Sequence, residues 1–410
     1  MKEPKIRFKG FSGEWKMPKL GDVFEIRNGY TPSKAVSAFW TNGTVPWFRM
    51  EDIRDKGGLL KEAYQKVTQE AVKGGGLFEA NSILLATTAT IGVHAMLIAD
   101  SLANQRFTNL KIRKSLVANY TPMYIYYSFF GIDEWCIKNS NAGGLLSVNM
   151  TELCKLPFLT PSLSEQRTLS SYFTSLDAQI SASTSRLASL KQVKAASLQA
   201  MFPQEGETVP KVRFKGFEGE WKKVKLNTFA KRIMRKNSNF ESSLALTIAS
   251  ANGLVSQAEY FNNLVVGSNI QNYYLLKKGE FAYNKSYSNG YPFGSVKRLD
   301  RYEQGILSTL YIVFSIDNSV SSDYITHFFD TTLWHKEIAE RAEEGARNHG
   351  LLNIATRDFF DIYIWMPDSV KEQQSIASFF TSLDRQIALH TQRLEKLKQI
   401  KAACLDKMFV

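Results

Sequence analysis

Two short runs have the acid–base spacing of half a nuclease site. Glu14-Trp-Lys16 and Glu220-Trp-Lys222 fit the Glu-x-Lys part of such a site, in which a carboxylate holds a metal ion and lysine stabilises developing charge. Neither run has a convincing aspartate before it at a useful distance. Both runs overlap the end of one duplicated block, so we interpret them as structural.

Other catalytic and metal-binding motifs are missing from the sequence. There is no Gly-Lys dipeptide, which excludes a Walker A loop, and no Pro-Pro dipeptide, which excludes the Asn-Pro-Pro-Tyr motif of adenine methyltransferases. We therefore predict no catalytic centre and no metal site in this chain. The five histidines lack the spacing of metal ligands: they are His94, His327, His335, His349 and His390.

Several loops in the second half combine cations, amides and aromatic rings. Amides can pair with adenine edges, while lysine and tyrosine can reach guanine or phosphate. The clearest run is Asn284-Lys-Ser-Tyr-Ser-Asn-Gly-Tyr291. The DNA-binding candidates in this half are Arg235, Lys236, Asn284, Lys285, Ser286, Tyr287, Asn289, Tyr291, Arg347, Asn348 and His349.

Similar clusters occur in the first half. Taken alone, each cluster is also typical of a solvated loop, and tryptophans such as Trp40 and Trp47 more often anchor a core than contact DNA. Their recurrence in both halves of a basic chain favours nucleic-acid binding. The candidates here are Lys34, Trp47, Arg49, Thr87, Thr88, Thr90, Gln105, Arg106, Asn139 and Asn141.

The composition agrees with a folded partner of nucleic acid. The 410 residues carry a formal net charge of +12 with a pI near 9.3, and 44% are hydrophobic. Such a charge suggests a polyanionic partner, although a merely soluble basic protein would also show it. The three cysteines form no CxxC pair and no signal peptide is visible, which predicts a cytoplasmic protein. The longest apolar stretch, residues 84–99, is too short to span a membrane and is interpreted as buried strand.

The sequence repeats itself. Pro4-Lys-Ile-Arg-Phe-Lys-Gly-Phe-Ser-Gly-Glu-Trp15 returns as Pro210-Lys-Val-Arg-Phe-Lys-Gly-Phe-Glu-Gly-Glu-Trp221, with ten of twelve positions identical. Residues 165–202 align without a gap to residues 372–409, with 22 of 38 positions identical. Between these blocks lie two dissimilar segments, roughly 17–160 and 223–366. The two halves of the chain therefore share the repeated blocks and differ in the segment that lies between those blocks.

The long repeat is predicted to be helical, with apolar residues at heptad spacing and no internal Pro or Gly. The duplicated seam favours pairing of the two helices with each other; the alternative is that each helix packs only on its own domain. Each helix would reach about 55 Å, more than one turn of B-DNA, which is roughly 34–36 Å. Lys194, Lys401, Ser183 and His390 are polar exceptions in the seam. The apolar residues at heptad spacing also include Met201 and Met408. The predicted pairing residues are Phe173, Leu176, Ile180, Leu187 and Leu190 in the first helix and Phe380, Leu383, Ile387, Leu394 and Leu397 in the second.

Each dissimilar segment mixes predicted strands and helices. Residues 82–86, 91–93, 110–112, 281–283 and 309–314 are predicted as strands. Residues 120–139 and 323–342 are predicted as helices. The helices and strands do not alternate regularly, so each segment is predicted to be a mixed α/β (α+β) domain.

The duplicated Pro-Lys-(Ile/Val)-Arg-Phe-Lys-Gly-Phe-x-Gly-Glu-Trp block and the duplicated Glu-Gln…Phe-Thr-Ser-Leu-Asp…Lys-Ala-Ala…Met-Phe helix resemble type I restriction–modification specificity subunits. Leu20-Gly-Asp-Val-Phe-Glu-Ile-Arg-Asn-Gly29 and Val45-Pro-Trp-Phe48 resemble the start of that family's target-recognition domain. The resemblance implies target-recognition domains at 1–160 and 207–366 and conserved helical spacers at 161–206 and 367–410. It also implies pseudo-twofold symmetry, with the two helices forming an antiparallel coiled coil.

The resemblance further implies a function and partners. Each recognition domain would read one half of an asymmetric, bipartite site in double-stranded DNA. Two methyltransferase subunits would modify an adenine in each half, and motor-nuclease subunits could join to cut unmodified DNA. S-adenosylmethionine, ATP and Mg would belong to those partners, and this chain would bind none of them.

Two other functions remain open from the residues alone. One is a nuclease or methyltransferase with a cryptic active site, which the missing motifs disfavour. The other is a coiled-coil interaction scaffold that does not bind DNA, which the basic charge and the paired loops disfavour.

Overall fold

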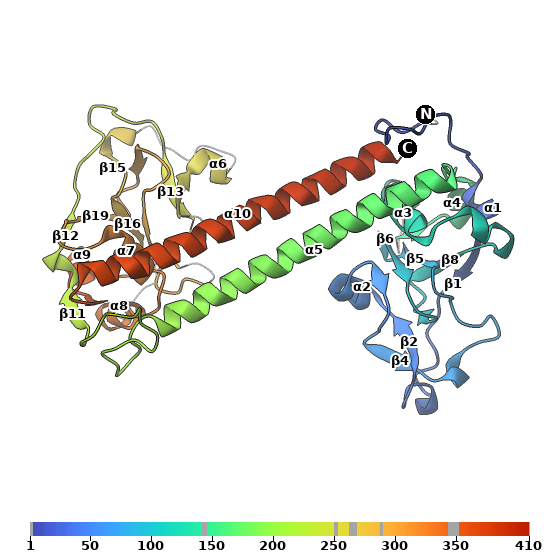
Figure 1. Cartoon of the computed structure of the whole chain (residues 1–410), viewed down its shortest axis with the longest axis horizontal. Helices are drawn as coiled ribbons and strands as arrows, with labels where there is room; N and C mark the ends of the chain where they lie inside the picture. Colours follow the sequence, from blue (N-terminus) through green and yellow to red (C-terminus); the bar gives the residue numbers. More distant parts are fainter. Residues whose placement is uncertain are drawn as a thin grey trace. The chain divides into compact units, whose positions relative to one another are not determined.

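The computed structural model of the chain describes residues 3–141, 146–249, 253–261, 269–287, 290–342 and 352–409. The chain forms two compact units (Figure 1). Unit 1 comprises residues 1–184 and 392–410, and unit 2 comprises residues 185–391. The linear boundaries expected at residues 160, 206 and 366 stay predictions.

Unit 1 is built on two sheets. The seven-stranded sheet has the order β1-β8-β5-β10-β9, with β6 paired to β5 and β3 to β6, and the second sheet has the order β4-β2-β7. Its strands are β1 (Phe24–Asn28), β2 (Val45–Phe48), β3 (Leu59–Leu60), β4 (Gln65–Val67), β5 (Ile83–Thr88), β6 (Thr90–Leu97), β7 (Leu102–Ala103), β8 (Phe107–Ile112), β9 (Ser140–Asn141) and β10 (Ser147–Val148). Its short helices are α1 (Leu20–Val23), α2 (Met50–Lys56), α3 (Pro122–Lys138) and α4 (Met150–Lys155).

The long apolar stretch in unit 1 is two strands and not one. Strands β5 and β6 pair antiparallel, and the chain reverses at Ala89, whose φ of 66° lies in the left-handed region. The three strands predicted here, at residues 82–86, 91–93 and 110–112, are confirmed. The predicted helix at residues 120–139 is confirmed as α3, which starts with Pro122 in its first turn and packs on β6.

Unit 2 has a four-stranded sheet in the order β12-β19-β16-β17 and three two-stranded sheets, β11-β20, β13-β14 and β15-β18. The strands are β11 (Lys222–Lys225), β12 (Ala230–Arg232), β13 (Leu246–Ala249), β14 (Gly253–Ser256), β15 (Tyr274–Lys277), β16 (Phe281–Asn284), β17 (Ser295–Arg298), β18 (Gln304–Leu307), β19 (Ile312–Ile316) and β20 (Tyr363–Met366). The short helices are α6 (Gln257–Phe261), α7 (Ser322–Phe328), α8 (His335–Arg341) and α9 (Thr356–Phe360).

The helix predicted at residues 323–342 is wrong, because the chain breaks it into α7 and α8. The hydroxyl of Thr331 donates to the carbonyl oxygen of Phe328 at 2.7 Å, competing with the helical backbone bonds. The indole of Trp334 is 1% exposed and donates to the carbonyl oxygen of Phe329 at 3.2 Å. The strand predicted at residues 309–314 is confirmed as β19, although it begins later, at Ile312.

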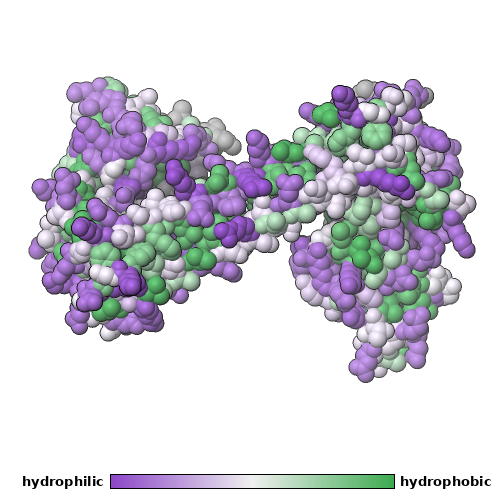
Figure 2. Space-filling model, in the orientation of Figure 1, coloured by the Kyte–Doolittle hydropathy of each residue, from purple (hydrophilic) through white to green (hydrophobic). Residues whose placement is uncertain are grey.

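The two long helices contribute to the main core of each unit. Phe173 and Met408 lie in the largest apolar cluster of unit 1, and Met201 and Phe380 lie in that of unit 2. In the view of Figure 2, hydrophilic residues cover much of the outer surface of each unit, and hydrophobic residues form smaller patches. Across the described ranges, no helix has the length and apolar character needed to cross a membrane.

Helices α5 (Leu163–Ala200) and α10 (Val370–Met408) are drawn as uninterrupted ribbons in Figure 1. In unit 1, Phe173 packs on Phe409 with ring centroids 5.6 Å apart, and the ammonium nitrogen of Lys401 lies 2.6 Å from a carboxylate oxygen of Asp177. Residue numbers thus rise along α5 as they fall along α10, which makes the helices antiparallel. The predicted mixed α/β class with two long antiparallel helices is confirmed.

Unit 2 repeats the same contacts. Phe202 packs on Phe380 with ring centroids 6.1 Å apart, and Lys194 lies 2.7 Å from a carboxylate oxygen of Asp384. The two seam lysines are therefore matched by acidic residues of the other helix. Of the predicted pairing residues, Phe173, Leu176, Leu190, Phe380, Leu383 and Leu394 are buried, and Ile180, Leu187, Ile387 and Leu397 are half-buried.

The duplicated short block fastens the segment before unit 1's sheet to α5. The Nε and Nη2 atoms of Arg7 donate to both carboxylate oxygens of Glu165 at 2.7 Å, and Nη1 donates to the carbonyl oxygen of Gly13 at 2.7 Å. Arg213, Glu372 and Gly219 make the same three bonds in unit 2, at 2.7, 2.8 and 2.6 Å. These contacts explain why the arginine, the glycine and the glutamate all recur in the sequence.

Candidate nucleic-acid interface

Three loops of unit 1 meet at one end of its sheets. Asn28, the last residue of β1, pairs with Thr108 at the start of β8. Phe48, the last residue of β2, pairs with Ala103, the last residue of β7. The loops that follow β1 and β2 therefore lie beside residues 104–106, which connect β7 to β8.

A close backbone approach holds these loops together. A Cβ atom on Gly29 would lie 2.1 Å from the carbonyl oxygen of Asn104, so only glycine fits there. The next residue, Tyr30, donates its backbone N–H to the carbonyl oxygen of Ala103 at 2.8 Å. The hydroxyl of Thr31 then donates to the amide oxygen of Gln105 at 2.5 Å.

We call the resulting cavity, of about 340 Å³, the basic hollow. Five of the ten first-half candidates line it, and three of those five are cations, against one carboxylate in the lining. This arrangement can attract a phosphate and present amide groups to a base edge. The lining residues are Thr31, Lys34, Trp47, Arg49, Met50, Glu51, Asn104, Gln105 and Arg106.

The three cations of the basic hollow differ in how far they are engaged. Arg49 Nη2 lies 2.8 Å from a carboxylate oxygen of Glu51, while Arg49 Nε is buried without a hydrogen-bond partner in the described part of the chain. Lys34 and Arg106 are exposed, and neither side chain forms an ion pair with a described residue. The basic hollow therefore has cationic side chains that can bind an anionic ligand.

Trp47 does not present its ring for stacking. It is 3% exposed, its indole donates to the carbonyl oxygen of Tyr30 at 3.0 Å, and it packs edge-to-face on Trp40 with centroids 5.1 Å apart. The prediction of a DNA contact at Trp47 is therefore corrected. As the alternative interpretation held, Trp47 packs in a core cluster, and it also lines the basic hollow.

The Thr-rich turn between β5 and β6 lies beside the same loops, because the backbone N–H of Thr87 donates to the carbonyl oxygen of Arg106 at 3.0 Å. The Thr87 side chain is itself buried, with its hydroxyl 2.8 Å from that of Thr108, so a DNA contact by Thr87 is also corrected. Thr88 and Thr90 are half-buried on either side of Ala89. These two hydroxyls remain candidates.

Two asparagines lie beside this turn on the same sheet. Ser147 of β10 pairs with Thr88 on one side and with Asn141 on the other. Asn141 is exposed, whereas Asn139 donates its side-chain N–H to the carbonyl oxygen of Trp135 at 2.9 Å, at the end of α3. Asn141 is therefore the freer of the two.

In unit 2, Arg235 and Lys236 are used inside the fold. Arg235 Nη2 lies 2.6 Å from a carboxylate oxygen of Glu280. Lys236 donates to the carbonyl oxygen of Asn272 at 2.9 Å and lies 4.0 Å from the ring centroid of Tyr274. These contacts hold both half-buried cations against their own unit, and their predicted role as DNA contacts stays a prediction.

The other candidates of unit 2 follow β16. Asn284 is half-buried, and its side-chain oxygen accepts the backbone N–H of Ser286 at 3.0 Å. The carbonyl oxygen of Lys285 accepts the N–H of Leu352 at 2.9 Å, while Tyr287 is 57% exposed. Tyr291 lines a separate hollow of about 230 Å³. The remaining predicted contacts, Asn289, Arg347, Asn348 and His349, lie outside the described residues.

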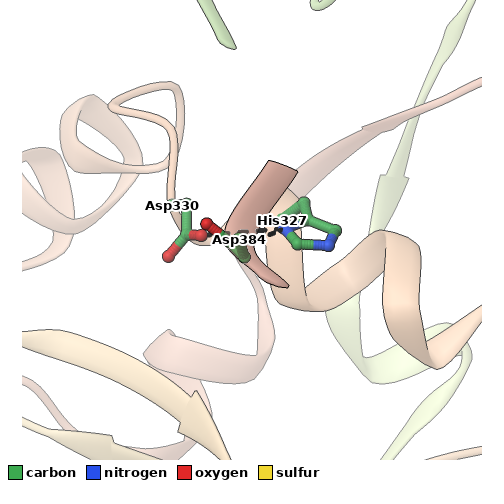
Figure 3. Close-up of side chains that lie close together, drawn as sticks. All are labelled: His327, Asp330 and Asp384. Atoms are coloured by element: carbon green, nitrogen blue, oxygen red, sulfur yellow. Dashed lines mark ion pairs between the residues drawn. The ribbon is translucent and has the colours of Figure 1, made fainter. Parts of the chain in front are cut away.

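The sequence interpretation missed a charged cluster in unit 2. His327 of α7, Asp330 just after it and Asp384 of α10 point toward one another (Figure 3). His327 Nδ1 lies 3.7 and 3.8 Å from carboxylate oxygens of Asp330 and Asp384. The only sequence signal was the lysine–aspartate spacing of the repeated helices, because in unit 1 the ammonium nitrogen of the seam lysine Lys401 lies 5.3 Å from the ring centroid of Phe130, where Lys194 of unit 2 meets Asp330.

Two ammonium groups already balance these carboxylates. Lys194 Nζ lies 3.0 Å from Asp330 and 2.7 Å from Asp384, and Lys297 Nζ lies 2.8 Å from Asp330. Burial opposes ionisation of Asp330, but the neighbouring His327 and the charges of Lys297 and Lys194 lower its pKa below the ordinary 3.8. The cluster is an ion-pair network that fastens unit 2 to its helices.

The sequence profile described as "Type I restriction modification DNA specificity domain" matches the chain twice, over residues 12–192 and 218–399. The chain belongs to this family. Each match includes the mixed α/β segment of one half and most of the long helix that follows it, in agreement with the duplication of the sequence.

The chain is also similar to named members of the family. Over 152 residues it is 47% identical to the type I restriction enzyme EcoprrI specificity subunit of Escherichia coli, a match covering 37% of each protein. Over 169 residues it is 27% identical to the MjaIX specificity subunit of Methanocaldococcus jannaschii, covering 40% of this chain and 38% of that protein. These matches span less than half of the length of either relative.

A solved structure shares the fold over the whole chain. The type I restriction–modification S subunit from M. genitalium superposes with a TM-score of 0.63 at 12% identity, covering 100% of this chain and 99% of that one. At this identity the likeness concerns the fold alone.

Proposed function

We propose that this chain reads DNA sequence for a type I restriction–modification complex, with each unit reading one half of a bipartite, asymmetric site. The observation that carries the proposal is the basic hollow, where candidates distant in the sequence lie in one lining. The duplicated frame supports two readers in one chain.

Affinity and specificity would come from different groups. Lys34 and Arg106 are exposed cations and would attract phosphates irrespective of sequence, with a loss of binding as salt rises. The amide of Gln105 belongs to the same lining and would read a base edge. Asn284 and Lys285 are the proposed readers of unit 2.

The chemistry is assigned to partner subunits. Methyltransferase subunits would supply S-adenosylmethionine-dependent adenine methylation, and motor-nuclease subunits would supply ATP- and Mg-dependent cleavage, all in the cytoplasm. A second solved relative, with a TM-score of 0.52 at 14% identity, comes from work on complex assembly and conformational transition of the type I R-M system. This agrees with a chain that works within a complex.

Two rival functions make different predictions. A cryptic enzyme would transfer methyl groups to DNA, or cleave it, as the purified chain alone. A coiled-coil scaffold would show no salt-dependent DNA binding.

The decisive experiment selects preferred DNA sites from a random library, with the complete complex. Gln105→Ala should relax one base position in one half-site, at a cost of about 1–3 kcal/mol, and leave the other half-site unchanged. Lys114→Ala is the matched control, because Lys114 follows the opposite end of β8 and is exposed. Unchanged preference in Gln105→Ala would show that the basic hollow does not read bases.

A further inference from the structure

Helices α3 and α7 occupy equivalent places in the two units. The hydroxyl of Tyr124 in α3 donates to the carbonyl oxygen of Leu159, and that of Tyr324 in α7 donates to the carbonyl oxygen of Trp365. Each tyrosine also packs on the phenylalanine that closes the neighbouring long helix: Phe409 in unit 1, at 5.9 Å between centroids, and Phe202 in unit 2, at 5.7 Å.

One turn further along, the two helices differ. Phe328 in α7 lies four residues after Tyr324, is fully buried, and packs on Phe202 with ring centroids 6.2 Å apart. The residue four after Tyr124 in α3 is Ser128. Unit 1 therefore lacks the phenyl ring that covers the equivalent phenylalanine in unit 2.

A cavity of about 200 Å³ lies beside Ser128. Phe409 forms one wall and is only half-buried, whereas its counterpart Phe202 is fully buried. Gly131 forms another part of the wall, and a Cβ atom added there would meet no atom within 4 Å. The lining residues are Tyr124, Ser128, Gly131, Ile132, Trp135, Leu156, Pro157, Phe158, Leu159 and Phe409.

The lining selects for an apolar, uncharged occupant. None of the lining residues carries a charged side chain. The hydroxyl of Ser128 is already donated to the carbonyl oxygen of Ile125 at 2.8 Å, and that of Tyr124 to Leu159. A dry cavity of about 150 Å³ with apolar walls is known to accept benzene, so this one has room for an aromatic ring.

We propose that this cavity is a binding site for a small neutral aromatic molecule, of the size of phenol or indole. The ring takes the place that Phe328 fills in unit 2, between α3 and the end of α10. Because the ligand binds the folded state between these two elements, it stabilises unit 1 by an amount that rises with the logarithm of its free concentration above the Kd.

The test titrates phenol and indole into the full chain, with ligand-observed NMR for binding and thermal unfolding for stability. Wild type should bind both compounds and unfold at a higher temperature in their presence. Benzoate should bind more weakly, since no cation lines the cavity to pair with its charge. Ser128→Phe, which fills the cavity from within, should weaken binding by about tenfold or more.

Ser128→Ala is the matched control, because it removes the same hydroxyl but leaves the space open, and it should bind as wild type does. If Ser128→Phe does not fold, Ser128→Leu fills part of the same space and should still weaken binding. Equal binding by wild type and the filled variants would overturn the proposal, as would the absence of binding to wild type up to the solubility limit.

Discussion

Breaking the ion pair between Arg7 and Glu165 should loosen unit 1 and leave unit 2 intact. The perturbation is a double-mutant cycle made of Arg7→Ala, Glu165→Ala and the double variant. The two side chains share two hydrogen bonds of 2.7 Å, with side-chain exposures of 15% for Arg7 and 2% for Glu165.

The expected magnitude follows from the burial. Removing one partner of a buried pair strands a charge away from water, which costs about 3–5 kcal/mol. Because Arg7 retains some exposure, we expect about 3 kcal/mol for Arg7→Ala, which strands Glu165 at the start of α5. The double variant should cost less than the sum of the single ones, with a coupling energy of about 1–3 kcal/mol.

Hydrogen exchange followed by mass spectrometry is the assay, because it reports the opening of each unit separately. The single variants should speed exchange in residues 3–23 and 163–184, with residues 222–366 unchanged. Arg213→Ala and Glu372→Ala are matched controls that should reverse the pattern, since that pair has nearly the same geometry. If the effects of the two single variants simply add in the double variant, for the pair in each unit, the argument that these ion pairs hold the short duplicated blocks to the long helices would be refuted.

Three further outcomes are expected. Because the folded-state pKa of Asp330 lies below 3.8, its contribution to stability is present above about pH 4 and is lost as the pH falls further. In urea unfolding, wild type should therefore lose more stability than Asp330→Asn on acidification, and equal losses in the two proteins would contradict this. Gly29→Ala places a Cβ atom 2.1 Å from the carbonyl oxygen of Asn104, so it should lower the free energy of unfolding by about 1–3 kcal/mol and change the base preference in one half-site. A Tm equal to that of wild type would show that the loops tolerate the added atom. Inserting seven residues into both α5 and α10, after Leu187 and after Leu394, keeps the apolar seam in phase and lengthens each helix by about 10 Å. In site selection, the preferred DNA spacer between the two half-sites should then grow by about three base pairs. An unchanged spacer would show that the helices do not set its length.

The duplicated blocks and the two long helices were predictable because their sequence patterns are local and occur twice. Equal heptad patterns in two helices predicted their pairing, and the buried seam has the expected form. The two lysine–aspartate pairs across the seam were not predicted. The bidentate contact of Arg7 with Glu165 was not predicted, although both residues belong to duplicated blocks. Recurrence showed that these residues matter, but not that they touch across 158 positions.

The candidate contacts were less predictable, because residue type does not reveal which side of a strand faces the core. Trp47 and Thr87 have suitable chemistry, yet packing and hydrogen bonding turn both inward. Lys34, Arg49 and Gln105 converge on one hollow only because β1, β2 and β7 end at the same edge. That meeting depends on strand register, which the spacing of residues along the chain does not contain.

The most direct test of the central claim is to replace residues 223–366 with the equivalent segment of another family member that has a different target. Methylated adenines would then be mapped across a genome in cells that supply the methyltransferase partner. Independent reading predicts that one half-site changes to that of the donor while the other half-site keeps its sequence. A simultaneous change of both half-sites, in a folded and active complex, would contradict the account.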